Sequence, residues 1–103
     1  MGQAKFVNQS VQFGDLRAHL LLVELERGRT IIHLRADDPA DARELTHRSR
    51  IAVDRHGEPL PHLVTLSGGT GVEMHVTHVY DGVPTDHLVL LNDAGEPAIT
   101  MSV

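Results

Sequence analysis

The sequence predicts an all-β fold, an immunoglobulin-like antiparallel β-sandwich of about seven or eight strands. Apolar and polar residues alternate with a period of two over most of the chain, as in strands that bury one face. Clusters of Gly, Pro, Asn and Asp recur roughly every eight to twelve residues, which is typical of sandwiches and barrels. Repeated helical segments of crossover length are missing from the sequence, so a parallel α/β sheet is not expected. Alternation does not specify strand order, which leaves sandwich and barrel as alternatives.

Length and composition fit one folded domain spanning residues 1–103. A chain of 103 residues supports a single hydrophobic core of modest size. Charged residues make up 22% and hydrophobic residues 41% of the chain, which argues against intrinsic disorder. Aromatic residues make up only 3% and Trp is absent, so Leu, Val and Ile must form the core.

Charge and residue usage exclude several classes of partner. The formal net charge is -5 and the nine Lys and Arg residues are scattered, so nucleic acid is not an expected partner. The chain has no Cys, which removes disulfides, thiolate chemistry and Cys-ligated zinc. No apolar run approaches the roughly 20 residues of a membrane span, so membrane insertion is not expected. We expect a cytoplasmic location if the chain is complete and an extracytoplasmic one if it is excised from a larger protein.

The first half of the chain predicts a β-hairpin. Residues 4–13 form a first extended stretch that carries Phe6 among its apolar side chains. Residues 17–26 form a strand whose middle is apolar on both faces, and residues 29–36 form the return strand. Gly28 supplies a residue that tolerates positive φ in the tight turn between them.

The segment 37–49, with the sequence DDPADARELTHRS, differs in character. Asp38 could cap a helix whose first residue is Pro39, and the residues that follow are adequate helix formers. A short helix at 39–48 and a polar loop are both compatible with this composition.

The second half predicts further strands separated by turns. A turn spelled Asx-x-x-Gly-Glu-Pro occurs twice, beginning at Asp54 and at Asn92. Asx accepts backbone hydrogen bonds, Gly adopts positive φ and Pro starts the next strand, so the spelling favours a hairpin turn. A cation site is disfavoured, because each copy has too few carboxylates for a calcium loop. The expected strands are residues 50–54, 60–66, 72–80, 87–91 and 98–103.

The second half of the chain has the pattern strand, Asp-x-x-Gly turn, strand, Gly-rich turn, strand, Asp-Gly-Val-Pro, strand. Its characteristic residues are Ile51 to Asp54, Gly57, Tyr80, Pro84, Leu88 and Leu90. On this pattern, residues 12–91 resemble the small immunoglobulin-like domains of bacterial membrane-anchored and anti-sigma-factor-like proteins. The resemblance implies a non-enzymatic sandwich used for protein contact, and it brings no catalytic residues. The sequence departs from these domains in lacking their membrane helix and linker, and in adding a last strand, GEPAITMSV.

Eight His residues are the one unusual feature of the composition. His62 and His75 lie on strands that the Gly68-Gly69 turn would make neighbours, and with His87 they form a candidate zinc site, since zinc needs three or four converging ligands. His78 lies three residues from His75, so the two should face opposite sides of a strand. The alternative is that these His residues are ordinary sheet residues and that the protein has no cofactor.

Leu20, Leu22 and Val23 are candidate interface residues. They belong to a run of consecutive apolar residues, and strands that are buried on both faces have such runs. In a thin sandwich the outer face of this strand would need a partner, for which we expect a homodimer or another domain. The alternative is that residues 37–49 fold over this face.

These features favour a non-enzymatic protein-binding or assembly module. The competing hypothesis is a small β-barrel enzyme, or a ligand- or metal-binding protein that uses the His cluster. No Ser of the chain lies in a nucleophile-elbow sequence, so the sequence identifies no catalytic residue.

Overall fold

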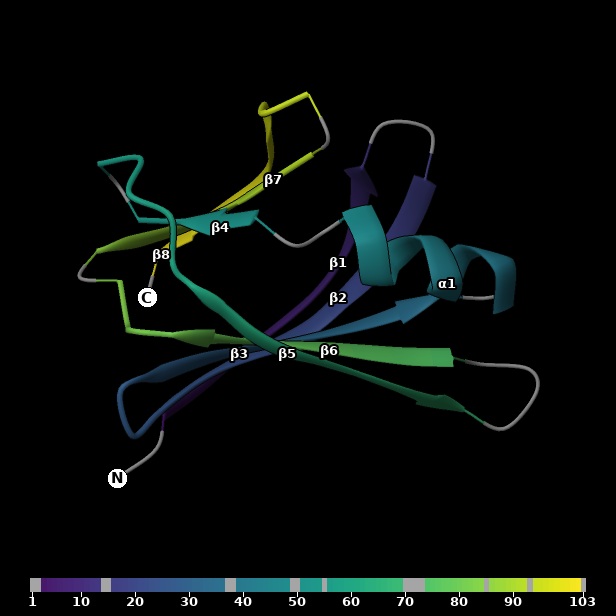
Figure 1. Cartoon of the computed structure of the whole chain (residues 1–103), viewed down its shortest axis with the longest axis horizontal. Coiled ribbons are helices and arrows are strands. Elements are labelled where there is room, and N and C mark those ends of the chain that lie inside the picture. The colour runs from purple at the N-terminus through teal and green to yellow at the C-terminus, as the bar shows by residue number, and fades with distance from the viewer. Residues whose placement is uncertain are drawn as a thin grey trace.

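The computed structural model describes residues 3–13, 16–36, 39–48, 51–54, 56–69, 74–84, 86–92 and 94–102. These residues form eight strands and one helix (Figure 1). In chain order the elements are β1 (Gln3–Phe13), β2 (Leu16–Glu26), β3 (Arg29–Ala36), α1 (Pro39–Arg48), β4 (Ile51–Val53), β5 (His62–Gly69), β6 (Met74–Asp81), β7 (His87–Leu91) and β8 (Pro97–Ser102).

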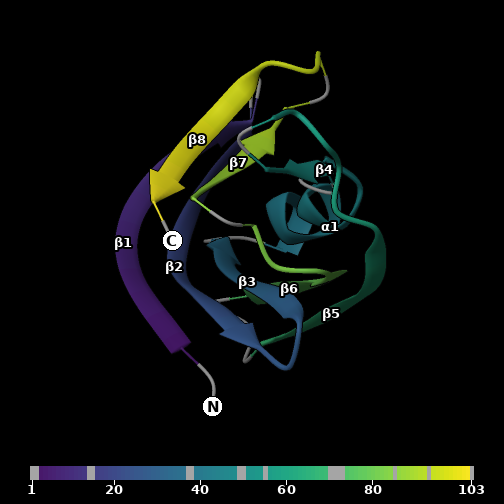
Figure 2. The same ribbon diagram turned by 90° about the vertical axis from the view of Figure 1, so that its left-hand side faces the viewer.

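The strands form two antiparallel sheets, which confirms the predicted all-β sandwich. The larger sheet has five strands in the order β1-β2-β3-β6-β5, and the smaller has three in the order β4-β7-β8. In the immunoglobulin order the third strand crosses to the opposite sheet, whereas here β3 stays beside β2. Figure 2 shows β8 alongside β1, where the Lys5 ammonium donates a hydrogen bond of 2.5 Å to the Ser102 carbonyl.

The hairpin of β2 and β3 is confirmed, with a two-residue turn. Arg27 and Gly28 both have positive φ, 53° and 73°, as the twist-matched hairpin turn requires. The turn is hydrogen-bonded to the residue that follows β6, since the Gly82 amide donates to the Gly28 carbonyl at 2.7 Å. The buried Thr30 hydroxyl donates to the Gly82 carbonyl at 2.8 Å.

The core lies between the five-stranded sheet and a cover made of the small sheet and α1. Alternate residues of β3 and β6 face this core, and they are buried while their neighbours are partly exposed. Buried side chains of β7, β8 and α1 belong to the same cluster, so sheet and helix cover one face. Each buried aliphatic side chain contributes about 1.5–3 kcal/mol. The cover supplies Ala42, Leu45, Ala52, Leu88, Leu90 and Met101.

A β-bulge in β2 corrects the interface prediction for two residues. The register with β3 shifts between Leu20 and Leu22, so the residues that face the core change from even to odd numbers. Leu20 is 0% and Val23 is 1% exposed, and both lie in the protein's own core. Neither can contact a partner. Leu22 is half-buried and lies on the opposite face.

Segment 39–48 is a helix, and it covers the inner face of the large sheet. Ala42 and Leu45 are buried against the core, and α1 contacts β2, β3, β6 and β5. The helix therefore leaves uncovered the face on which Leu22 lies. The predicted cap, Asp38, lies outside the described residues. Within the described part of the chain, no helix has the length and apolar character needed to cross a membrane.

The repeated Asx-x-x-Gly-Glu-Pro sequence forms the same turn twice. Asp54 Oδ1 accepts hydrogen bonds from the amides of His56 and Glu58, at 2.9 and 3.0 Å. Asn92 Oδ1 accepts from the amides of Ala94 and Glu96 at the same two distances. The Gly of each copy has a φ of 80°. The Asx oxygen is thus occupied by backbone donors, as the turn interpretation expects.

The Asx oxygen should stabilise the turn between β7 and β8. Asn92→Ala removes the acceptor for two backbone amides, and we expect it to lower the free energy of unfolding by about 1 kcal/mol. Asn92→Asp is the matched control, because Asp fills this position in the first copy, and it should stay close to wild type. Urea unfolding of the three proteins measures the difference. Equal stability of Asn92→Ala and wild type would contradict the assignment.

Candidate functional site

The three His residues predicted to bind zinc do not converge. In the register of β5 with β6, His62 lies opposite Tyr80, while His75 lies opposite Gly68. Residues 62 and 68 span about 20 Å of extended strand, so the two imidazoles lie far apart. His87 is exposed on β7, in the other sheet. Among the residues that the structure describes, no group of three or more His, Cys, Asp or Glu could hold a metal ion.

His62 instead belongs to a hydrogen-bonded chain with Thr65 and His78. His62 Nε2 lies 2.7 Å from Thr65 Oγ1, which lies 2.9 Å from His78 Nδ1. His78 Nε2 lies 3.1 Å from the carbonyl oxygen of Leu45, in the last turn of α1. His78 and Tyr80 are both 0% exposed, and their rings pack around that of His62.

Hydrogen-bond chemistry gives this chain a direction. The Leu45 carbonyl only accepts, so His78 Nε2 carries the proton and donates it. In neutral His78 the Nδ1 atom is then the acceptor, and the Thr65 hydroxyl donates to it. Thr65 in turn accepts from Nε2–H of His62. These hydrogen bonds link α1 to β6 and β5. Because His78 is fully buried, we assign the hydrogen-bonded chain a structural role. Sequence reasoning missed this role of His78, although the alternation of Val76, His78 and Tyr80, all of them buried, is a signal that could have identified it as inward-facing.

The outer face of the five-stranded sheet, opposite the helix and the small sheet, carries a second set of apolar side chains. Residues paired across antiparallel strands share a face. Ile31, Val79 and Val64 lie side by side in one row of residues that are paired across adjacent strands. The next row contains Leu66 and the pair of Phe6 with Leu22. Phe6 is 73%, Leu66 58% and Val64 43% exposed. We call the set of Phe6, Leu22, Ile31, Val64, Leu66 and Val79 the apolar band.

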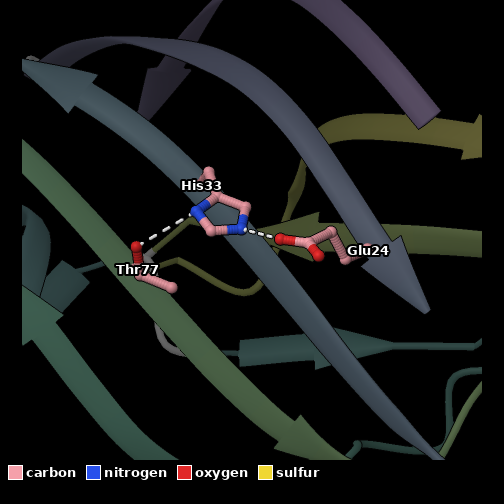
Figure 3. Close-up of polar contacts among 3 residues, drawn as sticks. All are labelled: Glu24, His33 and Thr77. Carbon is pink, nitrogen blue, oxygen red and sulfur yellow. Dashed lines mark hydrogen bonds and ion pairs between the residues drawn. The ribbon is translucent and has the colours of Figure 1, made fainter. Parts of the chain in front are cut away.

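A polar network of Glu24, His33 and Thr77 lies in the middle of the apolar band. Figure 3 shows these three side chains. His33 Nε2 lies 2.5 Å from Glu24 Oε1, and the Thr77 hydroxyl lies 3.2 Å from His33 Nδ1. The side chains of His33 and Glu24 are 28% and 34% exposed. Each polar group is directed at another member of the network, which reduces the cost of surrounding them with apolar surface.

The order hydroxyl, imidazole, carboxylate is also that of a nucleophile, its base and an orienting acid. Acyl transfer needs, in addition, donors aimed at the oxygen that becomes charged. Thr77 lies on β6, which is paired on both sides, with β3 and with β5. The backbone amides of this strand are therefore engaged in the sheet and cannot form an oxyanion hole around Thr77. The arrangement suits a cross-strand network better than catalysis.

Charged and polar residues bound the apolar band at both ends. Glu26, Arg29 and Asp81 align in a register row at one end. His19, Arg35 and His75 align at the other. Charged and polar residues at the boundary of an apolar surface are typical of the rim of a protein interface.

Comparisons of the chain with protein families, with curated proteins and with solved structures found no match. The functional assignment therefore rests on the structure of this protein.

The His62–Thr65–His78 chain should stabilise the fold. Thr65→Val keeps the shape of the side chain but leaves Nδ1 of buried His78 without its donor. We expect a loss of about 1–3 kcal/mol in the free energy of unfolding. Thr65→Ser keeps the hydroxyl and is the control, with a smaller loss expected. Chemical unfolding measures both variants, and a Thr65→Val protein as stable as wild type would refute the role given to the hydroxyl.

Proposed function

We propose that this protein is a non-catalytic assembly module that binds a second copy of itself through the outer face of its five-stranded sheet. The apolar band is the observation that carries the proposal. It spans all five strands of this sheet, from Phe6 on β1 to Leu66 on β5. Large contiguous apolar patches on an exposed surface are typical of protein–protein contact sites.

The apolar band avoids the main electrostatic obstacle to self-association. The chain has a net charge of -5, so two copies repel each other wherever acidic groups meet. Within the apolar band the carboxylate of Glu24 is already paired with His33. A self-complementary contact related by a two-fold axis uses the same surface on both copies, and such dimers are the commonest oligomers.

The competing hypothesis of an enzyme or metal-binding protein has less support. It depended on His62, His75 and His87 acting together, and these residues lie on different parts of the fold. The hydroxyl–imidazole–carboxylate arrangement at Thr77 is on a central strand of the sheet, where backbone donors are engaged in hydrogen bonds with the neighbouring strands. Both observations leave the apolar band as the better-supported site.

Phe6 should be required for self-association. Its side chain is 73% exposed, so Phe6→Lys should not unfold the protein. A charge in the apolar band must be desolvated on contact, and we expect a rise of at least about tenfold in the dissociation constant of the dimer. Sedimentation velocity over a range of protein concentrations measures it.

The control for this substitution is Thr100→Lys. Thr100 is exposed on β8, opposite Val89 on the outer side of the small sheet, and should leave the dissociation constant unchanged. A wild-type protein that stays monomeric at high concentration would overturn the proposal. So would a Phe6→Lys protein that associates as strongly as wild type.

A further inference from the structure

The apolar band encloses a titratable pair, formed by His33 on β3 and Glu24 on β2. His33 is paired with Leu22 on one side and with Thr77 on the other. Glu24 is paired with Ile31. Leu22 and Ile31 belong to the band, so a second copy that covers the band also covers this pair.

The network around His33 keeps its hydrogen bonds in both charge states of the imidazole (Figure 3). In the neutral ring Nε2–H donates to Glu24 Oε1, and Nδ1 accepts from the Thr77 hydroxyl. In the protonated ring both nitrogens donate, so Nδ1–H donates to Thr77 Oγ1 while the hydroxyl rotates. Protonation of His33 therefore changes the charge of the network without breaking its contacts.

The two charge states differ in the cost of covering the network. With neutral His33 the network carries the negative charge of Glu24, and with protonated His33 it is an ion pair without net charge. Both side chains are partly exposed, at 28% and 34%, so water solvates the carboxylate in a free copy. A second copy removes this water, and burying a lone carboxylate is far less favourable than burying a close ion pair. The covered state therefore favours protonated His33.

We infer that association through the apolar band takes up protons at His33, so that mild acid strengthens the contact between two copies. This inference rests on the proposed self-association and adds its regulation. Imidazole groups change charge between about pH 5 and pH 8. Because the associated copies hold this proton more tightly than the free copies, linkage makes association tighter where His33 is protonated. Association is strongest at the acid end of this range and weakens as the pH rises.

Other charged groups on this face lie outside the two rows of the band. Strands β1 and β5 contribute only uncharged side chains to these rows, among the described residues. The row on one side of the band contains His19, Arg35 and His75, and the row on the other contains Glu26, Arg29 and Asp81. Two of these six residues are His and titrate in the same range as His33. They lie at the rim, where groups stay in contact with water and their charge affects association less.

Sedimentation velocity at constant ionic strength tests the proton uptake. We expect the dissociation constant of the wild-type dimer to fall at least about tenfold between about pH 8 and about pH 6. His33→Gln should remove most of this change, because Gln can donate to Glu24 and accept from Thr77 but does not titrate. His75→Gln is the matched control at the rim and should keep the wild-type dependence. A wild-type dissociation constant that is equal at both pH values would overturn the inference.

Glu24→Gln separates this linkage from a general loss of repulsion. Protonation of the eight His residues reduces the net charge of -5, which by itself favours association in acid. In Glu24→Gln, however, protonated His33 has no carboxylate beside it, and covering it leaves a buried charge uncompensated. We expect this variant to associate more weakly at about pH 6 than at about pH 8, the reverse of the wild type. A Glu24→Gln protein that strengthens in acid as the wild type does would overturn the inference.

Phe6→Lys, measured at both pH values, distinguishes the inference from the proposed function. A wild-type dimer that Phe6→Lys weakens, but whose dissociation constant does not change with pH, would overturn the proton uptake and support the outer face. A pH-dependent dimer that Phe6→Lys leaves intact would locate the contact away from the apolar band and overturn both. A wild-type protein that stays monomeric at both pH values and at high concentration would also overturn both.

Discussion

The five-stranded sheet carries apolar side chains on both of its faces, and the other described elements cover only one of them. The small sheet and α1 form that cover, and their buried residues join one cluster with Leu20, Ile32 and Leu34. The opposite face keeps the apolar band. The network of Glu24, His33 and Thr77 follows from this asymmetry. These polar side chains lie within an apolar surface and form hydrogen bonds with one another.

The buried side of the sheet is held to the helix by a polar contact as well as by packing. His78 lies among apolar residues and has hydrogen-bond contacts at both ring nitrogens, to Thr65 and to the Leu45 carbonyl. Burying the His78 imidazole without these contacts would lower the stability of the fold, so the hydrogen-bonded chain fixes the position of α1 on β6 and β5. Holding the helix on the inner face leaves the outer face open for a partner.

Local chemistry made much of the fold predictable from the sequence. Period-two alternation located the strands, and the Asx and Gly residues identified both copies of the repeated turn. Pairings between distant segments were not predictable, since they depend on the order of strands in the sheets. The bulge in β2 turned Leu20 and Val23 inward, and only Leu22 of the three predicted interface residues lies on the outer face. The register of β5 with β6 brought His62 to His78 and Tyr80 and left His75 distant.

The central claim is that the apolar band is covered by a second copy of the protein. Methyl relaxation by a dissolved paramagnetic probe, followed by NMR over a range of protein concentrations, tests it most directly. The account predicts that methyl groups of Ile31, Val64 and Val79 are accessible in dilute protein and become protected as concentration rises. Methyl groups of Leu34 should be protected throughout, because this core residue is 0% exposed. Equal accessibility of the band at every concentration would contradict the account.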